Sequence, residues 1–176
     1  LFVGFVDGLV EQVDHEAAAD VPALLEQTSR ADGTQTVGDV LTGLVGQIRE
    51  KIEIASIARL EREGQGIVGG YQQHDQKKGA IVAIESDRDP AELQEFAKRL
   101  CMHIVFSMPT AFSRDEIPAE VCEKEQRILR EQLTEDPKMA GKPAQVMEKI
   151  LEWKLSAFFK QSVLGEQEWA LPDSDR

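Results

Sequence analysis

The chain has 176 residues, 41% of them hydrophobic and 30% charged, which suits one ordinary domain or two small subdomains that share a core. Its 32 acidic and 20 basic residues give a formal net charge of −12, and such a chain repels the phosphate backbone of nucleic acids. No stretch approaches the roughly 20 apolar residues of a membrane-spanning helix, so we expect neither nucleic acid nor a membrane as a direct partner.

Cysteine usage points to a reducing compartment. Cys101 and Cys122 are too few and too isolated for a disulfide framework or a Cys-rich zinc site. We expect the cytoplasm, with the matrix of an organelle as the alternative.

The N-terminal part is predicted to be helical. Apolar residues at spacings of three and four begin with Phe2 and Val6, and the absence of an initiating Met suggests a fragment or a processed piece. Pro22 suits the opening of a short helix. Thr36 is the expected N-cap of a helix that ends near Lys51, with one apolar face made by Val37, Val40, Leu41, Leu44, Val45 and Ile48.

The period of the pattern then changes to two, which predicts β-structure. Strands are expected over 52–59, 67–72 and 80–84, separated by short polar turns. Because turns this short cannot hold a parallel crossover, the strands must pair antiparallel. The predicted fold class is therefore α+β, with a three-stranded antiparallel sheet packed on helices.

Helices are expected again after the sheet. Asp89 and Pro90 suit a helix start, and Pro109 should stop that helix. Residues 118–135 and a helix after Pro143 have narrow apolar stripes, which predict a projecting antiparallel coiled-coil hairpin. The seam expected on its second helix consists of Val146, Ile150, Trp153 and Ala157.

The residues reveal no catalytic centre. Gly64, Gly66 and Gly69 match the spacing of a dinucleotide-binding loop, but the segment that follows is a predicted strand rather than a helix. The three histidines (His15, His74 and His103) have no second His or Cys three or four positions away, as a helical metal pair would. We expect no enzyme activity, cofactor or metal, and a protein that works through contact with another macromolecule.

Several segments, taken in order, resemble the elongation factor Ts family. They are 44–54 with 58–61; Val68-Gly69-Gly70-Tyr71-Gln72-Gln73-His74 with the strand 81–84; 102–104; 118–121; 123–125; 141–143; 148–150; 158–160; and 164–167. The resemblance covers roughly residues 37–172. It implies a guanine-nucleotide exchange factor, without a catalytic centre of its own, that binds elongation factor Tu and loosens its GDP.

The resemblance also implies where the partner would bind. The matching positions are Ile48, Arg49, Tyr71, Gln72, Gln73 and His74. An aromatic residue with polar neighbours at a hairpin tip has a common interface composition, although an ordinary solvated turn uses the same residues. Periodicity alone makes Ile48 a core residue.

The chain departs from the family's pattern at several points. Arg49 replaces a Gly of the family, and His74 matches the family's His only if Gln73 is an insertion. The family's Thr-Asp-Phe-Val segment and N-terminal helical module precede the part present here. We therefore expect this chain alone to promote nucleotide exchange more slowly than a chain that contains the missing segment.

The expected organisation has four parts. They are a helical lead-in at 1–46, a sheet subdomain with its covering helix at 47–113, the coiled-coil hairpin at 114–162 and a tail at 163–176. A competing hypothesis is a non-catalytic structural adaptor that uses the acidic hairpin, with Trp153 and Phe158, for protein–protein contact. The sequence leaves the oligomeric state open.

Overall fold

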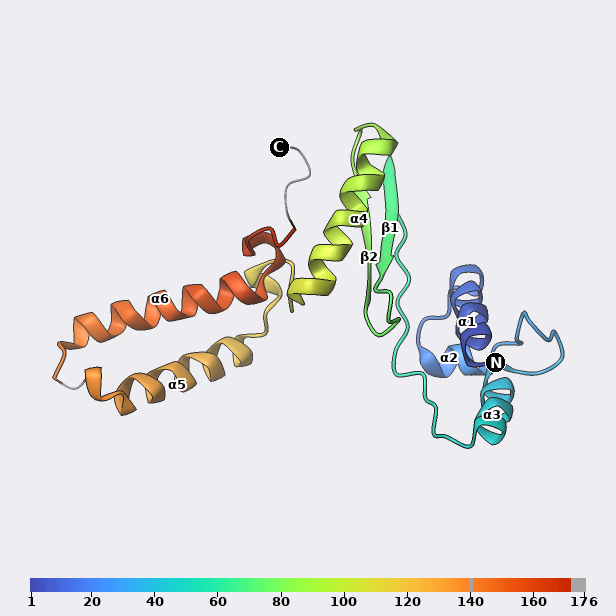
Figure 1. Cartoon of the computed structure of the whole chain (residues 1–176), viewed down its shortest axis with the longest axis horizontal. Coiled ribbons are helices and arrows are strands. Elements are labelled where there is room, and N and C mark those ends of the chain that lie inside the picture. The colour runs from blue at the N-terminus through green and yellow to red at the C-terminus, as the bar shows by residue number, and fades with distance from the viewer. Residues whose placement is uncertain (140, 172–176) are drawn as a thin grey trace. The chain divides into compact units, whose positions relative to one another are not determined.

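The computed structural model describes residues 1–139 and 141–171, and the chain divides into two compact units (Figure 1). Unit 1 is Leu1–Glu61 and unit 2 is Arg62–Arg176. The described residues form helices and one antiparallel sheet, so the predicted α+β class is confirmed. The four-part division of the chain stays a prediction, and residues 172–176 of its expected tail lie outside the described residues.

Unit 1 consists of α1 (Phe2–Glu16), α2 (Val21–Glu26) and α3 (Val37–Ile48). The predicted cap of α3 is confirmed: Thr36 Oγ1 accepts from the Asp39 N–H, while the Asp39 carboxylate accepts from the Thr36 N–H at 3.2 Å. This reciprocal pair satisfies two amide groups that the first helical turn leaves without partners. The Thr36 bonds also lower the pKa of Asp39.

The core of unit 1 lies where its helices meet. Val13, Leu24 and Val37 are buried there, one from each helix. Partly buried apolar side chains pack around them: Leu9, Ala18, Leu25, Ile54 and Ile57.

The strand expected over 52–59 is absent, so the prediction of a third strand was wrong. Residues 49–65 contain no strand, and the sheet has two strands instead of three. Ile54 and Ile57 pack on the helical core of unit 1 rather than beside a neighbouring strand. The alternation of apolar residues therefore reflects burial against helices, which an extended segment achieves without a hydrogen-bonded ladder.

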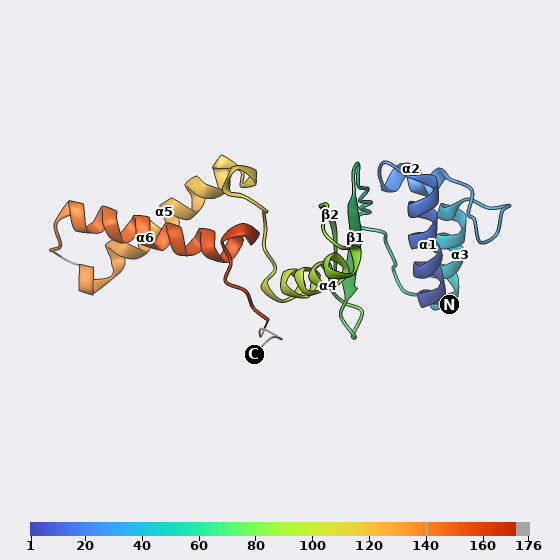
Figure 2. The ribbon, with the colours of Figure 1, turned by 90° about the horizontal axis from the view of Figure 1, so that it is seen from above.

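Unit 2 begins with a β-hairpin and the helix that covers it. Strands β1 (Gly66–Gln72) and β2 (Gly79–Glu85) pair antiparallel, with Gly66 opposite Glu85 and Gln72 opposite Gly79. Helix α4 (Pro90–Ser107) packs on both strands, as Figures 1 and 2 show. Its predicted start is confirmed, because Asp89 Oδ1 accepts from the Ala91 N–H at 2.8 Å and Pro90 occupies the first turn.

Small residues allow α4 to approach the sheet closely. Ala97 is fully buried, and a Cβ placed on Gly69 would lie only 2.6 Å from the Ala97 Cβ. Because side chains alternate along a strand, the odd-numbered residues Ile67, Gly69 and Tyr71 lie on the face toward α4. Val68, Gly70 and Gln72 lie on the opposite, more exposed face.

Helices α5 (Ala119–Glu135) and α6 (Ala144–Ser162) form an antiparallel hairpin (Figure 2). Its buried residues are Leu129, Leu133 and Leu151, surrounded by Met139, Met147, Ile150 and Leu155. The seam predicted for α6 was largely wrong: of its members only Ile150 belongs to this cluster, and Trp153 is 71% exposed. The residues that pack follow the steps from Met147 to Leu151 to Leu155, four positions apart.

Short 3-10 turns flank the hairpin: η1 (Arg114–Glu116), η2 (Pro137–Met139) and η3 (Leu164–Glu166). The segment before α5 and the segment after α6 are joined by backbone hydrogen bonds. The N–H groups of Thr110 and Ala111 donate to Ser162 O, at 2.8 and 3.3 Å, and Leu164 N–H donates to Ala111 O at 2.9 Å.

None of the helices in the part of the chain that the structure describes has the length and apolar character that a membrane span requires.

Candidate functional site

The tip of the β-hairpin carries four of the six residues predicted to contact a partner. We call residues 71–78 the hairpin tip. Gln73 N–H donates to Lys78 O at 2.8 Å, and Gln76 N–H donates to Gln73 O at 2.8 Å. Gln76 has a left-handed backbone, with φ of 58°, so the turn is closed by its own backbone bonds.

The four predicted side chains of the hairpin tip are not equivalent. Tyr71 and Gln73 are half-buried, whereas Gln72 and His74 are exposed. Tyr71 lies opposite Ala80, on the face of the sheet toward α4. An open hollow of about 410 Å³ adjoins Tyr71 and is also lined by Gly70, Gln72, Gly79, Ala80 and Ile81. The hollow has mainly small or apolar walls, which suit an apolar side chain from another protein better than a charged ligand.

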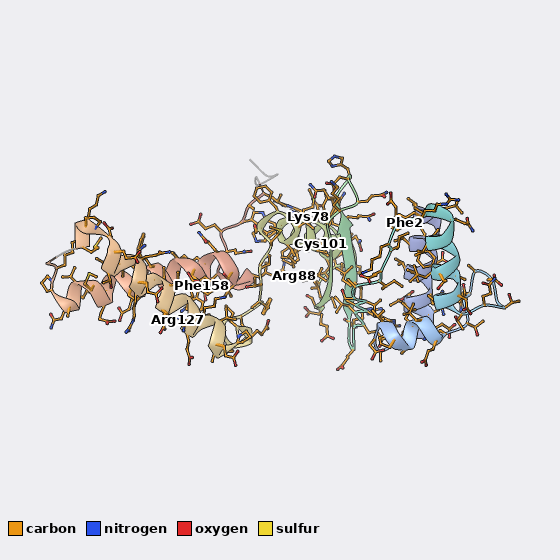
Figure 3. The ribbon with its side chains drawn as sticks, turned by 90° about the horizontal axis from the view of Figure 1, so that it is seen from below. Phe2, Lys78, Arg88, Cys101, Arg127 and Phe158 are labelled. Atoms are coloured by element: carbon orange, nitrogen blue, oxygen red, sulfur yellow. The ribbon has the colours of Figure 1, made fainter. Side chains whose placement is uncertain are left out.

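A buried thiol lies beneath the tip. Cys101, on α4, is fully buried between α4 and the sheet (Figure 3), with its Sγ 3.8 Å from Gly69 O. Burial raises the pKa of the Cys101 thiol, and a weaker contribution from the Tyr71 backbone acts in the opposite direction. A buried thiol with a raised pKa is a poor nucleophile, so Cys101 serves packing rather than chemistry.

The other two predicted residues belong to unit 1, at the end of α3. Arg49 is the C-cap residue: its N–H donates to Val45 O at 2.8 Å, and its backbone is left-handed, with φ of 60° and ψ of 29°. The Arg49 side chain is exposed and Ile48 is half-buried. Glycine is the usual residue in this conformation because it lacks a Cβ, so Arg49 holds its position at some cost in free energy.

Sequence reasoning missed the residues that flank the hairpin tip. Lys78 Nζ lies 3.4 Å from the sulfur of Met108, the C-cap residue of α4. Met108 is 61% exposed and Phe106 is 75% exposed. In the sequence, Pro109 indicated only that α4 ends near residue 108.

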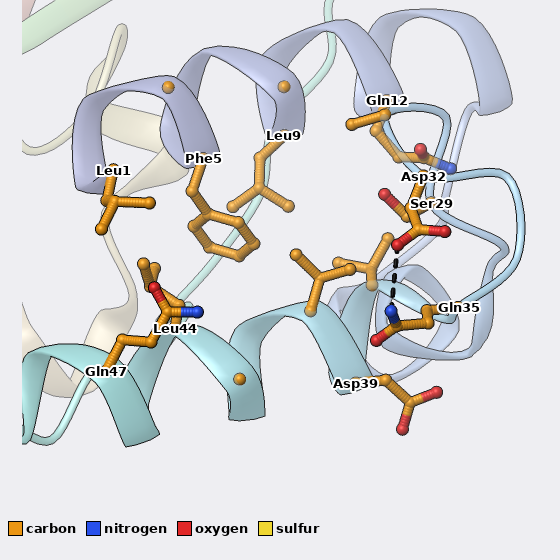
Figure 4. Close-up of a pocket in the computed structure, with 16 residues that line it drawn as sticks. Leu1, Phe5, Leu9, Gln12, Ser29, Asp32, Gln35, Asp39, Leu44 and Gln47 are labelled. Carbon is orange, nitrogen blue, oxygen red and sulfur yellow. Dashed lines mark hydrogen bonds between the residues drawn. The ribbon is translucent and has the colours of Figure 1, made fainter.

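Unit 1 contains a second hollow, of about 370 Å³, between α1 and α3 (Figure 4). Leu1, Phe5, Leu9 and Leu44 line its apolar end, and a Gln35 Nε2–Asp32 Oδ2 hydrogen bond of 3.0 Å marks the polar end. Its other polar lining residues are Gln12, Ser29, Asp39 and Gln47.

Two further arrangements bear on chemistry. The glycines at 64, 66 and 69 lie in a turn and in β1, as predicted, and not before a helix that could hold a pyrophosphate. Within residues 1–139 and 141–171, no group of three or more His, Cys, Asp or Glu side chains is arranged to hold a metal ion.

Comparison with known proteins gives a consistent result. The family model described as elongation factor TS matches residues 1–176. Elongation factor Ts of Clostridium botulinum (strain 657 / Type Ba4) is 30% identical over 169 residues, which cover 96% of this chain and 53% of the relative. That of Chlorobaculum parvum is 31% identical over 170 residues, covering 95% and 56%. That of Clostridium kluyveri is 29% identical over 174 residues, covering 99% and 55%. The chain thus spans about half the length of the curated relatives it matches.

Proposed function

The chain belongs to the elongation factor Ts family, and from that premise we propose that it binds elongation factor Tu and promotes the release of GDP from it. In this role the chain lowers the affinity of its partner for GDP, and it has no catalytic centre of its own. A translation factor of this kind needs a rigid contact surface rather than a reactive side chain.

The observation that carries the proposal is the rigid hairpin tip. Its backbone hydrogen bonds hold Tyr71 beside an open hollow, with exposed Gln72 and His74 next to it. A half-buried aromatic side chain loses little conformational entropy on binding, and such residues are common interface hot spots. We therefore assign Tyr71 as the anchor, and Gln72, Gln73 and His74 as its polar surroundings.

Ile48 and Arg49 form a second proposed contact, on unit 1. The left-handed turn at Arg49 ends α3 and leaves the guanidinium exposed. Arg49 can therefore offer up to five N–H donors to acceptor groups on the partner. Ile48 is half-buried and would contribute apolar surface beside it.

Binding of the chain to GDP-loaded elongation factor Tu tests the proposal directly. We expect a complex at micromolar concentration, detected by isothermal titration calorimetry. Tyr71→Ala should weaken the complex about tenfold or more, the usual effect at an interface hot spot. Asp87→Ala is a matched control, because Asp87 is an exposed residue beyond the opposite end of β2. Absence of any complex with the unaltered chain would refute the proposal.

The rate of GDP release is a separate test. The chain spans about half the length of its relatives, so its partner contacts should be fewer than theirs. We expect release of a fluorescent GDP analogue to be accelerated, but less than by a full-length family member. Arg49→Gly tests whether the family's residue at this position raises that rate.

A second candidate function is a structural adaptor that binds another protein through the α5–α6 hairpin. The observation in its favour is Trp153, which is 71% exposed on α6. If this function holds, Trp153→Ala should change the mass measured by light scattering or abolish capture of the partner. Unchanged mass and unchanged binding to elongation factor Tu would leave only the first function.

A further inference from the structure

One buried histidine of α4, His103, contacts several residues of the C-terminal segment, residues 163–171. His103 is 1% exposed. Its Nε2 lies 3.1 Å from Gln167 Oε1, and its Nδ1 accepts a hydrogen bond of 3.2 Å from the Ala170 N–H. The Trp169 ring stacks on the imidazole, with centroids 5.0 Å apart and planes 13° apart. Both nitrogens and one face of the ring are therefore engaged by the same short segment.

These hydrogen bonds define the protonation state of His103. An amide N–H can only donate, so Nδ1 must carry a lone pair toward Ala170. The Gln167 amide is oriented by its own Nε2, which donates to Gln161 O at 2.6 Å and to Ser107 O at 3.4 Å. Its Oε1 consequently accepts from the His103 Nε2–H. The attached segment requires the neutral imidazole with its proton on Nε2.

Several charged and polar groups lie around the attached segment. The Arg99 guanidinium, one turn earlier on α4, lies 5.7 Å from the centroid of the Trp169 ring that stacks on His103. Of the acidic groups on the segment, Glu166 is bound to Arg114 and Glu168 is exposed. Lys160 of α6 interacts electrostatically with Glu166. The Ser107 hydroxyl, 3.5 Å from Nδ1, can rotate to suit either state.

We propose that His103 is a pH-dependent latch that holds residues 167–170 on α4 when it is neutral and releases them when it is protonated. A proton on Nδ1 would face the Ala170 N–H, which removes one hydrogen bond and sets two donors against each other. Attachment is therefore complete at higher pH and is lost as the pH falls and the imidazole gains its proton.

Fluorescence of Trp169 tests the latch in the full chain. Trp153→Phe leaves Trp169 as the remaining tryptophan, and quenching by acrylamide measures its accessibility. Between about pH 8 and about pH 5.5, the range in which an imidazole gains a proton, we expect the quenching constant to roughly double. The reason is that Trp169 is 40% exposed when attached and would become fully exposed.

Two variants in the Trp153→Phe background test whether His103 causes the pH-dependent change in quenching. His103→Gln, which does not titrate, should abolish the pH-dependent change, whereas His74→Gln, on the exposed hairpin tip, should retain it. A change that persists in His103→Gln would overturn the proposal.

A measurement on the Trp153→Phe protein covers the case in which His103→Gln does not fold. Nitrogen NMR of the His103 ring should show the Nε2–H form near pH 8 and a protonation midpoint that coincides with the quenching change. A proton on Nδ1 near pH 8, or midpoints that do not coincide, would overturn the latch.

Discussion

The Arg114 guanidinium donates two hydrogen bonds to the Glu166 carboxylate and thereby joins the turn before α5 to the turn after α6. The same guanidinium lies 4.4 Å from the centroid of the Phe159 ring, so one side chain connects η1, α6 and η3. Arg114 is exposed and Glu166 is half-buried, so the effect of this pair on stability should be small and sensitive to salt.

Stability should depend on pH through this pair. The hydrogen bonds from Arg114 are the main reason that the pKa of Glu166 is lowered. A carboxyl group with a lowered folded-state pKa stabilises the fold at neutral pH and loses that contribution as the pH falls. Arg114→Gln should therefore lower the thermal midpoint slightly at neutral pH, and the difference from the unaltered chain should vanish in acid. Arg127→Gln, an exposed arginine on α5, is the control; an Arg114→Gln effect that persists in acid would contradict the assignment.

The close approach of β1 to α4 predicts a steric effect. Gly69→Ala would place a Cβ 2.6 Å from the Ala97 Cβ, so strand and helix must separate. We expect a loss of about 1–3 kcal/mol in the free energy of unfolding, the usual cost of overpacking, measured by urea denaturation. Gly70→Ala is the control on the opposite face, because its nearest contacts would be ordinary ones of 3.5 Å. Equal effects of the two substitutions would contradict the packing described.

The left-handed backbone at Arg49 predicts that a smaller residue stabilises unit 1. Arg49→Gly should raise the free energy of unfolding by about 1 kcal/mol, because glycine adopts this conformation without the Cβ clash. Arg49→Ala removes the side chain but keeps the Cβ, so it should not stabilise. A gain in both variants would mean that the guanidinium, and not the backbone, is the source of the cost.

Burial differs sharply between two residues of α6. Leu151 is buried in the seam with α5, so Leu151→Ala should cost about 2–3 kcal/mol, at the low end for leucine because a two-helix hairpin can partly close the cavity. Trp153→Ala, two positions further on, should change the unfolding free energy by less than about 0.5 kcal/mol. Circular dichroism during urea denaturation measures both, and a larger loss for Trp153 would restore the seam expected from the sequence.

Local signals in the sequence predicted most of the fold. Thr36, Asp89 and Pro90 have side-chain chemistry that acts within one helical turn, so helix starts could be located without knowing the rest of the molecule. The two strands of the hairpin were predicted as short segments on either side of a charged turn, the second of them nearly all apolar. Each of these features depends on neighbours in the chain.

The errors arose where distant residues decide the outcome. An extended segment at 52–59 has the same alternation whether it pairs with a strand or packs Ile54 and Ile57 on helices. Trp153 is apolar enough for a seam, but the register between α5 and α6 selects Leu151 instead. Of the candidate site, the sequence could indicate the hairpin tip, whereas the approach of Lys78 to Met108 depends on how α4 crosses the sheet.

The backbone hydrogen bonds between residues 110–112 and 162–165 hold the start and the end of the α5–α6 hairpin next to each other. A segment whose two ends already meet behaves as an insertion. Whole helical turns could be added to or removed from both α5 and α6, or a short loop could replace the two helices. The sheet and α4 would keep their structure. Differences in length among homologous chains should therefore be concentrated in the α5–α6 hairpin.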